Sequence, residues 1–64
     1  MEVIINGENR AGNFGTIADL LKSEDLDPKL VVVELNGAIV PKDNYEKPLK
    51  EGDAVEIVQF VAGG

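Results

Sequence analysis

Residues 30–41 of the chain read L-V-V-V-E-L-N-G-A-I-V-P. The first six residues are mostly apolar and β-branched, which is typical of a buried strand. Asn36-Gly37 follows, and this pair is a strong signal for a two-residue hairpin because both positions tolerate positive φ. Ala38-Ile39-Val40 then returns as a short strand that ends at Pro41. The stretch therefore predicts a β-hairpin within a sheet.

The same hairpin signal occurs at the start of the chain. Glu2-Val3-Ile4-Ile5 is short and β-branched, and Asn6-Gly7 follows it. The chain should therefore turn back as a second strand. This strand, around residues 8–13, has a poor apolar pattern and contains Gly12, so we expect it at an edge of the sheet.

A helix is predicted between the two hairpins. The Thr16 hydroxyl can accept a backbone N–H, and Asp19 stands three residues further on, which is a capping arrangement. One face of the following segment is apolar, with Ile17, Leu20 and Leu21. The helix should span about two turns and end near residues 23–25, since Asp27-Pro28 disfavours helical geometry before the proline.

Residues 42–51 are polar and predict a structured loop, in which Tyr45 and Leu49 should point inward. Gly52-Asp53 reads as a turn into a last strand over residues 54–60. The apolar phase of this strand slips between Ile57 and Val58, and a bulge or burial of both faces would explain the slip.

The resulting order is strand, strand, helix, strand, short strand, strand. A single helix can cover one face of a sheet, so the fold class is α+β. With 64 residues there is room for one domain, and a hydrophobic share of 44% with 28% charged residues predicts an ordered globular chain. No apolar run reaches the ~20 residues of a membrane span, and the N-terminus has no signal-peptide pattern, so we expect a cytoplasmic protein without a membrane partner.

Several mechanisms are excluded by composition. The chain contains no Cys and no His, which removes thiolate and imidazole chemistry within it. The acidic cluster Glu24, Asp25 and Asp27 lacks the pattern of a calcium loop, and we interpret it as a solvated helix end and turn. Gly12-Asn13-Phe14-Gly15 matches no phosphate-binding motif. We therefore predict no catalytic residue, no metal ligand and no cofactor bound by this chain.

Charge narrows the range of partners. Twelve acidic residues face six basic ones, for a formal net charge of -6. Phosphate backbones would repel such a chain, so we expect no nucleic-acid partner. The charge can serve solubility, and it can also steer the domain onto a basic partner surface.

The order of elements and the residues at their joints resemble the ubiquitin-like β-grasp fold and, more narrowly, the ThiS family of sulfur carrier proteins of thiamine biosynthesis. The resemblance covers the whole chain. The matching segments are V-I-I-N-G (3–7), T-I-A-D-L-L (16–21), N-G-A-I-V-P-K (36–42), E-G-D-A-V-E-I (51–57) and V-A-G-G (61–64). The resemblance implies a mixed sheet of four to five strands packed on one helix over residues 1–60, followed by a flexible tail, residues 61–64.

The resemblance also implies the chemistry of the last residues. Gly64 is the expected reactive residue: an adenylating enzyme of the ubiquitin-activating type, similar to ThiF, would charge its carboxylate with ATP and magnesium. A sulfur donor system would then form a thiocarboxylate, and a thiazole synthase similar to ThiG would accept the sulfur. Gly63 and Ala62 would thread the activating site, since small residues pass a narrow channel and glycine adopts φ and ψ values closed to other residues.

Other interpretations stay open. A Gly-Gly end on its own is also what an inert, frayed terminus looks like. The same activated end could be joined to lysines, as in a ubiquitin-like modifier, or serve a chain similar to the small subunit of molybdopterin synthase. A purely noncovalent binding module is a further alternative. In that module Val58, Phe60 and Val61 would form the docking patch and the tail would be inert, although such apolar positions are more often core. In a carrier, at least one of these residues near the tail is a candidate contact for the activating enzyme.

The chain departs from the family pattern at two positions. Arg and Trp are common in the family where this chain has Lys42 and Tyr45. Both replacements keep the charge or the aromatic bulk, so only the packing of the 42–51 loop is in question.

Overall fold

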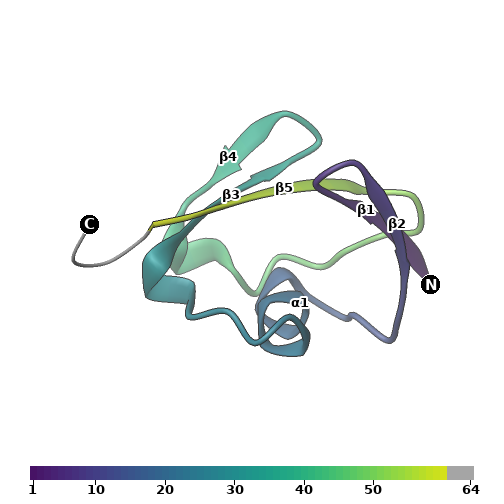
Figure 1. Ribbon diagram of the computed structural model, residues 1–64, viewed down its shortest axis with the longest axis horizontal. Coiled ribbons are helices and arrows are strands. Elements are labelled where there is room, and N and C mark those ends of the chain that lie inside the picture. The colour runs from purple at the N-terminus through teal and green to yellow at the C-terminus, as the bar shows by residue number, and fades with distance from the viewer. Residues whose placement is uncertain (61–64) are drawn as a thin grey trace.

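The computed structural model of the chain describes residues 1–60. Five strands and one α-helix follow one another with two short 3-10 helices between them (Figure 1). The elements are β1 (Glu2–Ile5), β2 (Glu8–Ala11), α1 (Ile17–Ser23), η1 (Pro28–Leu30), β3 (Val31–Leu35), β4 (Ala38–Val40), η2 (Lys42–Asn44) and β5 (Ala54–Gln59).

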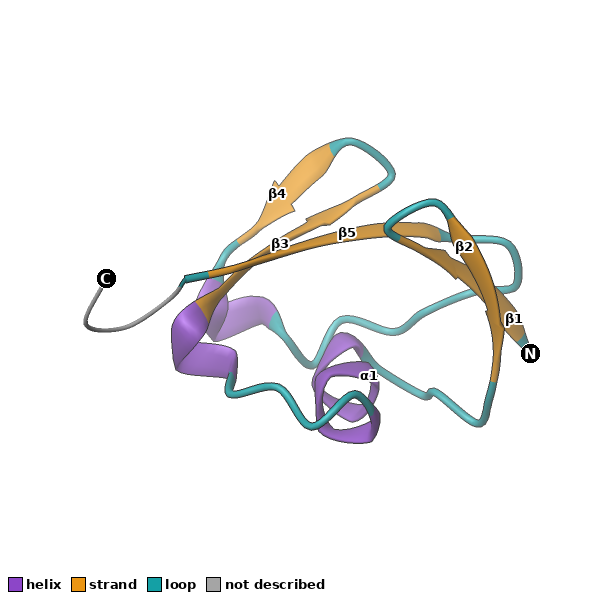
Figure 2. Ribbon diagram, viewed as in Figure 1, coloured by secondary structure: helices purple, strands orange, loops and turns teal. Residues whose placement is uncertain are grey.

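The strands form one mixed sheet in the order β2-β1-β5-β3-β4. The last strand, β5, is therefore central: it runs parallel to β1 and antiparallel to β3. The sheet curves over α1, which covers one of its faces (Figure 2). The predicted α+β layout and the edge position of β2 are confirmed.

Both hairpins turn at the predicted Asn-Gly pairs. Asn6 and Gly7 have φ angles of 49° and 84°, and Asn36 and Gly37 have 51° and 88°. These left-handed conformations cost asparagine and glycine less than other residues. The local sequence thus fixes the positions of both turns.

The N-terminus of α1 has the predicted cap. The Thr16 hydroxyl accepts from the Asp19 N–H at 3.1 Å, and Asp19 Oδ2 accepts from the Thr16 N–H at 3.2 Å. This reciprocal capping box satisfies backbone donors that the first helical turn leaves free. Within residues 1–60, no helix is long and apolar enough to cross a membrane.

The core lies between α1 and the inner face of the sheet. Its fully buried side chains, which leave less than 2% of their surface exposed, are Val3, Ile17, Leu20, Leu21, Val31, Val33 and Val55. Burial of a side chain of this kind stabilises a fold by about 1.5–3 kcal/mol. The α1 face predicted from its apolar spacing is therefore the face that packs against the sheet.

The 42–51 loop closes the open end of the core. Tyr45 and Leu49 are buried, as predicted. The loop also caps α1 from outside, because the Ala18 N–H donates to the Tyr45 carbonyl at 2.8 Å and the Ile17 N–H donates to the Lys47 carbonyl at 3.2 Å. Backbone groups of the first helical turn thus find partners far along the sequence.

Both explanations predicted for the apolar phase slip in the last strand, a bulge and burial of both faces, are wrong. β5 pairs with β3 in unbroken register from Val31↔Gln59 to Leu35↔Val55. Val55 faces the core, whereas Val58 belongs to the opposite set of the alternation and is 59% exposed. The apolar phase slips because the outer face of the sheet, which no helix within residues 1–60 covers, carries apolar side chains of its own.

Candidate functional site

The central strand β5 leads directly to the predicted reactive end. Val61, Ala62, Gly63 and Gly64 lie outside the described residues, and their predicted roles stay predictions. The strand before them is paired with β3 from Val55 to Gln59, and with β1 at Ala54 and Val55. Its hydrogen bonding continues past its end, where the Phe60 N–H donates to the Leu30 carbonyl at 2.8 Å. The chain is therefore fixed up to the residue that precedes the predicted tail.

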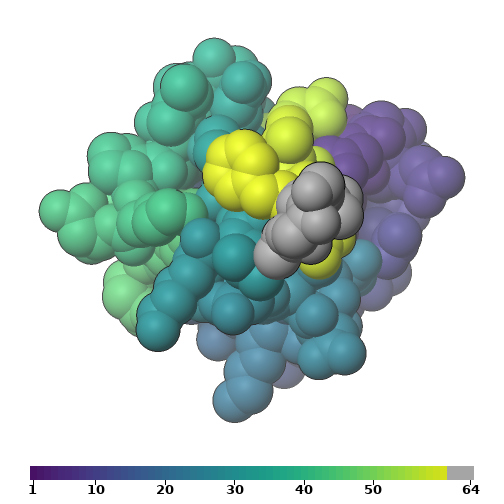
Figure 3. All heavy atoms as spheres, turned by 60° about the vertical axis from the view of Figure 1, so that its left-hand side comes forward, coloured from purple at the N-terminus to yellow at the C-terminus, as the bar shows by residue number. Residues whose placement is uncertain are grey.

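The outer face of the sheet carries an apolar patch beside this exit. We define the outer-face patch as Ile39, Val58 and Phe60, which are 68%, 59% and 54% exposed. Half-buried Val32 lies opposite Val58 in the ladder. Figure 3 shows the last described residues, in yellow, standing at the surface. Val58 and Phe60 are thus surface residues rather than core, as docking requires, whereas docking itself stays a prediction.

Two asparagine side chains help to hold β5. Asn6 Oδ1 accepts from the Ile57 N–H at 2.7 Å. Asn36 Oδ1 accepts from the Ala54 N–H at 2.9 Å, and its Nδ2 donates to Asp53 Oδ1 at 3.1 Å. Each turn asparagine therefore has a second role beyond its φ angle, which is to tie a hairpin to the central strand.

Lys42 and Tyr45 meet at one backbone carbonyl. Lys42 Nζ donates to the Val31 carbonyl at 2.8 Å and to the Pro28 carbonyl at 3.1 Å. The Tyr45 hydroxyl lies 3.5 Å from the same Val31 oxygen, and burial raises the pKa of the Tyr45 phenol above its ordinary value. Lys42 and Tyr45 thus hold the loop against the start of β3.

The acidic cluster after α1 has local structural roles. Glu24 accepts from Arg10 Nη1 at 2.9 Å, which ties the end of α1 to β2. Asp27 Oδ1 accepts from the Lys29 N–H at 2.9 Å and caps η1. This geometry confirms the interpretation of a helix end and turn.

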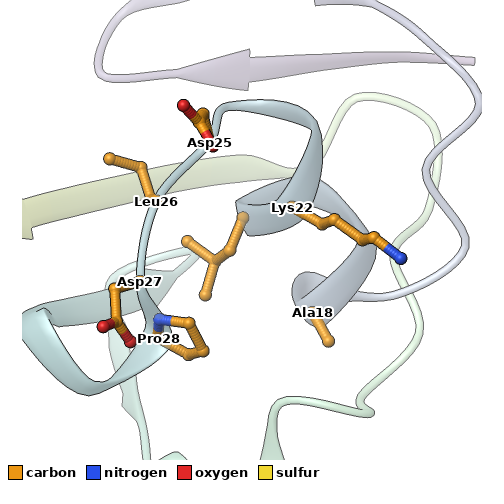
Figure 4. Close-up of a pocket in the computed structure, with 7 residues that line it drawn as sticks. Ala18, Lys22, Asp25, Leu26, Asp27 and Pro28 are labelled. Carbon is orange, nitrogen blue, oxygen red and sulfur yellow. The ribbon is translucent and has the colours of Figure 1, made fainter.

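An open hollow of about 490 Å³ lies beside α1 on the side away from the outer-face patch. Ala18, Leu21, Lys22, Asp25, Leu26, Asp27 and Pro28 line it. Figure 4 shows that the charged ends of Lys22, Asp25 and Asp27 diverge. A small-molecule site needs polar groups that converge on a ligand, and this hollow does not provide them.

A mixed sheet that curves over a single helix, with its last strand at the centre and leading to a Gly-Gly segment, defines the class of ubiquitin-like β-grasp proteins. Within that class, the family model described as "ThiS family" matches residues 3–64. The chain belongs to the ThiS family, and its relatives from Bacillus subtilis and Thermus thermophilus are sulfur carrier proteins.

Two relatives of known identity support the assignment to the ThiS family. The chain is 51% identical over 51 residues to the sulfur carrier protein ThiS of Bacillus subtilis, covering 78% of this chain and 77% of that protein. The crystal structure of the thiamine biosynthesis protein ThiS from Geobacter metallireducens matches with a TM-score of 0.84 at 29% identity and full coverage of both chains. The predicted fold and family are confirmed, and the chain is a homologue of the sulfur carriers of thiamine biosynthesis.

A third relative is a larger protein. The thiazole synthase of Paramagnetospirillum magneticum is 43% identical to this chain over an alignment of 68 positions. The alignment covers all of this chain but only 20% of that enzyme. A region similar to the whole carrier domain therefore occurs within a thiazole synthase.

Proposed function

We propose that this protein carries sulfur on the carboxyl carbon of Gly64. A free C-terminal carboxylate is ionised at neutral pH and resists nucleophilic attack. It needs activation first: a carboxylate oxygen attacks the α-phosphorus of ATP and displaces pyrophosphate, which leaves an acyl adenylate. Sulfide, as HS⁻, then attacks the carbonyl carbon, AMP departs, and loss of the sulfur-bound proton leaves a thiocarboxylate.

The observation that carries this proposal is the position of β5. The strand that leads to Gly64 is the central strand of the sheet, paired with β1 at its start and with β3 as far as Gln59, and its hydrogen bonding extends to Phe60. Only four residues, 61–64, separate this fixed point from the proposed reactive carbon. A short arm of defined reach supports delivery of the end into a partner's active site, because reaction rates depend on precise placement of reacting groups.

Small residues in this arm favour the same function. Gly63 and Gly64 lack Cβ atoms and Ala62 has only a methyl group, so the arm can enter a narrow channel and leave the reacting carbonyl unhindered. ATP and magnesium belong to the activating enzyme in this proposal, a ThiF-like adenylyltransferase. The cytoplasm, where ATP is available, is the compartment that we propose.

We propose a thiazole synthase as the acceptor of the sulfur. The supporting observation is the thiazole synthase that contains a region similar to this entire chain. Joining two domains in one polypeptide gives them a high effective concentration, which favours partners that act on one another. We further propose that the outer-face patch, together with Val61, docks onto these partners.

The test is activation of the purified chain. Incubation with the adenylating enzyme, ATP, magnesium and sulfide should exchange one oxygen for sulfur in the peptide that ends at Gly64, and intact and peptide mass spectrometry would detect it. Lysine-linked conjugates would instead favour the modifier. A mass that never changes under activating conditions would favour the noncovalent module.

A further inference from the structure

Two carboxylates lie opposite each other on the outer face of the sheet. Glu34 of β3 and Glu56 of β5 are direct partners in the antiparallel ladder. Glu56 is exposed and Glu34 is half-buried. Side chains opposite each other in such a ladder have Cβ atoms about 4.5–5.5 Å apart, and like charges there are destabilising.

Nothing basic on the described strands offsets this pair. Arg10 is the one basic residue in strands β1 to β5, and it forms ion pairs with Glu8 at 3.7 Å and Glu24 at 2.9 Å. Arg10 faces the side of α1, where Glu24 caps the helix. The Glu34–Glu56 pair therefore remains uncompensated among residues 1–60.

The acidic pair is continuous with the outer-face patch. Ile39 of β4 is the ladder partner of Glu34 on the other side, and the Val32↔Val58 pair lies two residues along the strands from Glu34↔Glu56. Phe60 follows two residues beyond Val58, at the exit toward the tail. Along an extended strand this places Glu56 about 13–14 Å from Phe60, at ~3.4 Å per residue.

We propose that Glu34 and Glu56 together receive one cationic side chain, an arginine, of the adenylating enzyme when the outer-face patch docks onto it. This inference rests on the proposed function and adds the chemistry of the partner surface. A planar guanidinium offers five N–H donors, enough for both carboxylates, and forms stronger paired bonds to them than a lysine ammonium. The repulsion that the free sheet tolerates is then relieved in the complex.

The proposal explains why an uncovered sheet face combines apolar and acidic groups. The apolar patch supplies non-directional contact area, and the acidic pair fixes the register of the docked domain. Fixed charge pairs contribute to orientation and association rate. The result is that Phe60, and with it the start of the tail, arrives at a defined place on the partner.

The test uses Glu34→Gln, Glu56→Gln and Glu56→Lys, with Glu46→Gln as control. Glu46 lies in the exposed loop after η2, so its variant changes the net charge by the same amount as the other two glutamine variants, at another site. Pyrophosphate exchange with the purified adenylating enzyme gives KM and kcat for each carrier, isothermal titration without ATP gives Kd, and thermal melts give Tm.

Each glutamine variant should melt at a higher temperature than the parent and show KM and Kd raised about tenfold, with kcat unchanged at saturation. Glu56→Lys should raise Tm further by pairing with Glu34, and it should bind more weakly than either glutamine variant. Salt should raise the KM of the parent more steeply than that of the glutamine variants. Glu46→Gln should behave as the parent.

Unchanged KM and Kd in all three variants would overturn the proposal and leave the pair a solubility feature. A rise in KM accompanied by a lower Tm would also overturn it, because the loss would then come from the fold. Failure of the proposed function is a separate result: the parent would bind the enzyme in the titration but never gain sulfur at Gly64.

Discussion

The side-chain amide of Asn6 takes the place of a backbone residue in the sheet, next to Ile57. Its Oδ1 accepts from the Ile57 N–H at 2.7 Å and its Nδ2 donates to the Ile57 carbonyl at 3.2 Å. The backbone of β1 pairs with β5 only as far as Ile5↔Val55 before it turns away. The amide therefore adds one more hydrogen-bonded pair to the parallel ladder, toward the C-terminal end of β5.

Asn6→Asp should destabilise the fold, because a carboxylate cannot donate to the Ile57 carbonyl and would repel it. We expect a loss of about 1–2 kcal/mol in the free energy of unfolding, measured by urea denaturation. Asn9→Asp is the matched control, since Asn9 lies on the exposed edge strand β2 and the change in charge is the same. Equal losses of stability in the two variants would show that the hydrogen bonds between the Asn6 amide and Ile57 contribute nothing to the free energy of unfolding.

Gly12 is required by the ring of Phe14. A Cβ at residue 12 would lie 2.3 Å from Phe14 Cζ, and Phe14 is a buried core residue. Gly12→Ala should therefore cost about 1–3 kcal/mol of stability through overpacking. Adding Phe14→Leu should restore part of this loss in thermal melts, and purely additive losses in the double variant would contradict the clash.

Tyr45 should make the fold sensitive to alkaline pH. Burial raises the pKa of its phenol above the ordinary 10.0, so the unfolded chain loses this proton first as pH rises. The contribution to stability is complete below about pH 10 and falls as pH rises from there through the folded pKa. The Tm of the parent should drop more steeply above about pH 10 than the Tm of Tyr45→Phe. Lysine side chains also titrate in this range, but the variant keeps all of them, so the difference between the two proteins reports on the phenol alone.

The same titration can be observed directly. Tyr45 is the one tyrosine and the chain has no tryptophan, so the ultraviolet absorbance of phenolate reports on this residue alone. We expect its midpoint to lie above that of the urea-unfolded chain. A midpoint equal to the unfolded value would show that the phenol is open to solvent.

Alanine variants of Phe60 and Leu20 should distinguish an effect on partner docking from an effect on stability. Phe60 is 54% exposed and Leu20 is 0% exposed. Phe60→Ala should keep stability within about ±0.5 kcal/mol while raising the KM for activation. Leu20→Ala should lose about 2–5 kcal/mol of stability. A large loss of stability in Phe60→Ala would place its ring in the core and remove it from the proposed docking surface.

Features set by neighbouring residues could be predicted from the sequence. The Asn6-Gly7 and Asn36-Gly37 turns and the Thr16–Asp19 capping box depend on bonds that span a few residues, and all are present as expected. The α+β order of elements followed from these local signals, whereas the mixed sheet packed on one helix followed from the family resemblance over the whole chain.

Long-range contacts could not be predicted in this way. The bonds from the first turn of α1 to the carbonyls of Tyr45 and Lys47 join segments that only the tertiary fold brings together. A bulge or burial of both faces was wrongly expected for the last strand, because alternation gives the phase of Val58 but not whether a second layer covers it. Once a single helix covers one face, the apolar outer face becomes evidence for a partner.

The tail should be sensitive to single methyl groups. Gly63→Ala adds one to a segment that we propose must enter the activating site, and misplacement of the reacting carbon by about an ångström can cost on the order of a hundredfold in rate. Pyrophosphate exchange should fall while Tm stays unchanged. Exchange at the parent rate would mean that the tail does not thread a tight channel.

The most direct test of the account is the mass of the terminal peptide after incubation with the adenylating enzyme, ATP, magnesium and sulfide. We predict an oxygen-for-sulfur exchange located at Gly64, and none in a chain that carries one added alanine after Gly64, whose stability should equal that of the parent. Sulfur gained equally by the extended chain, or no sulfur gained by the parent, would contradict the account.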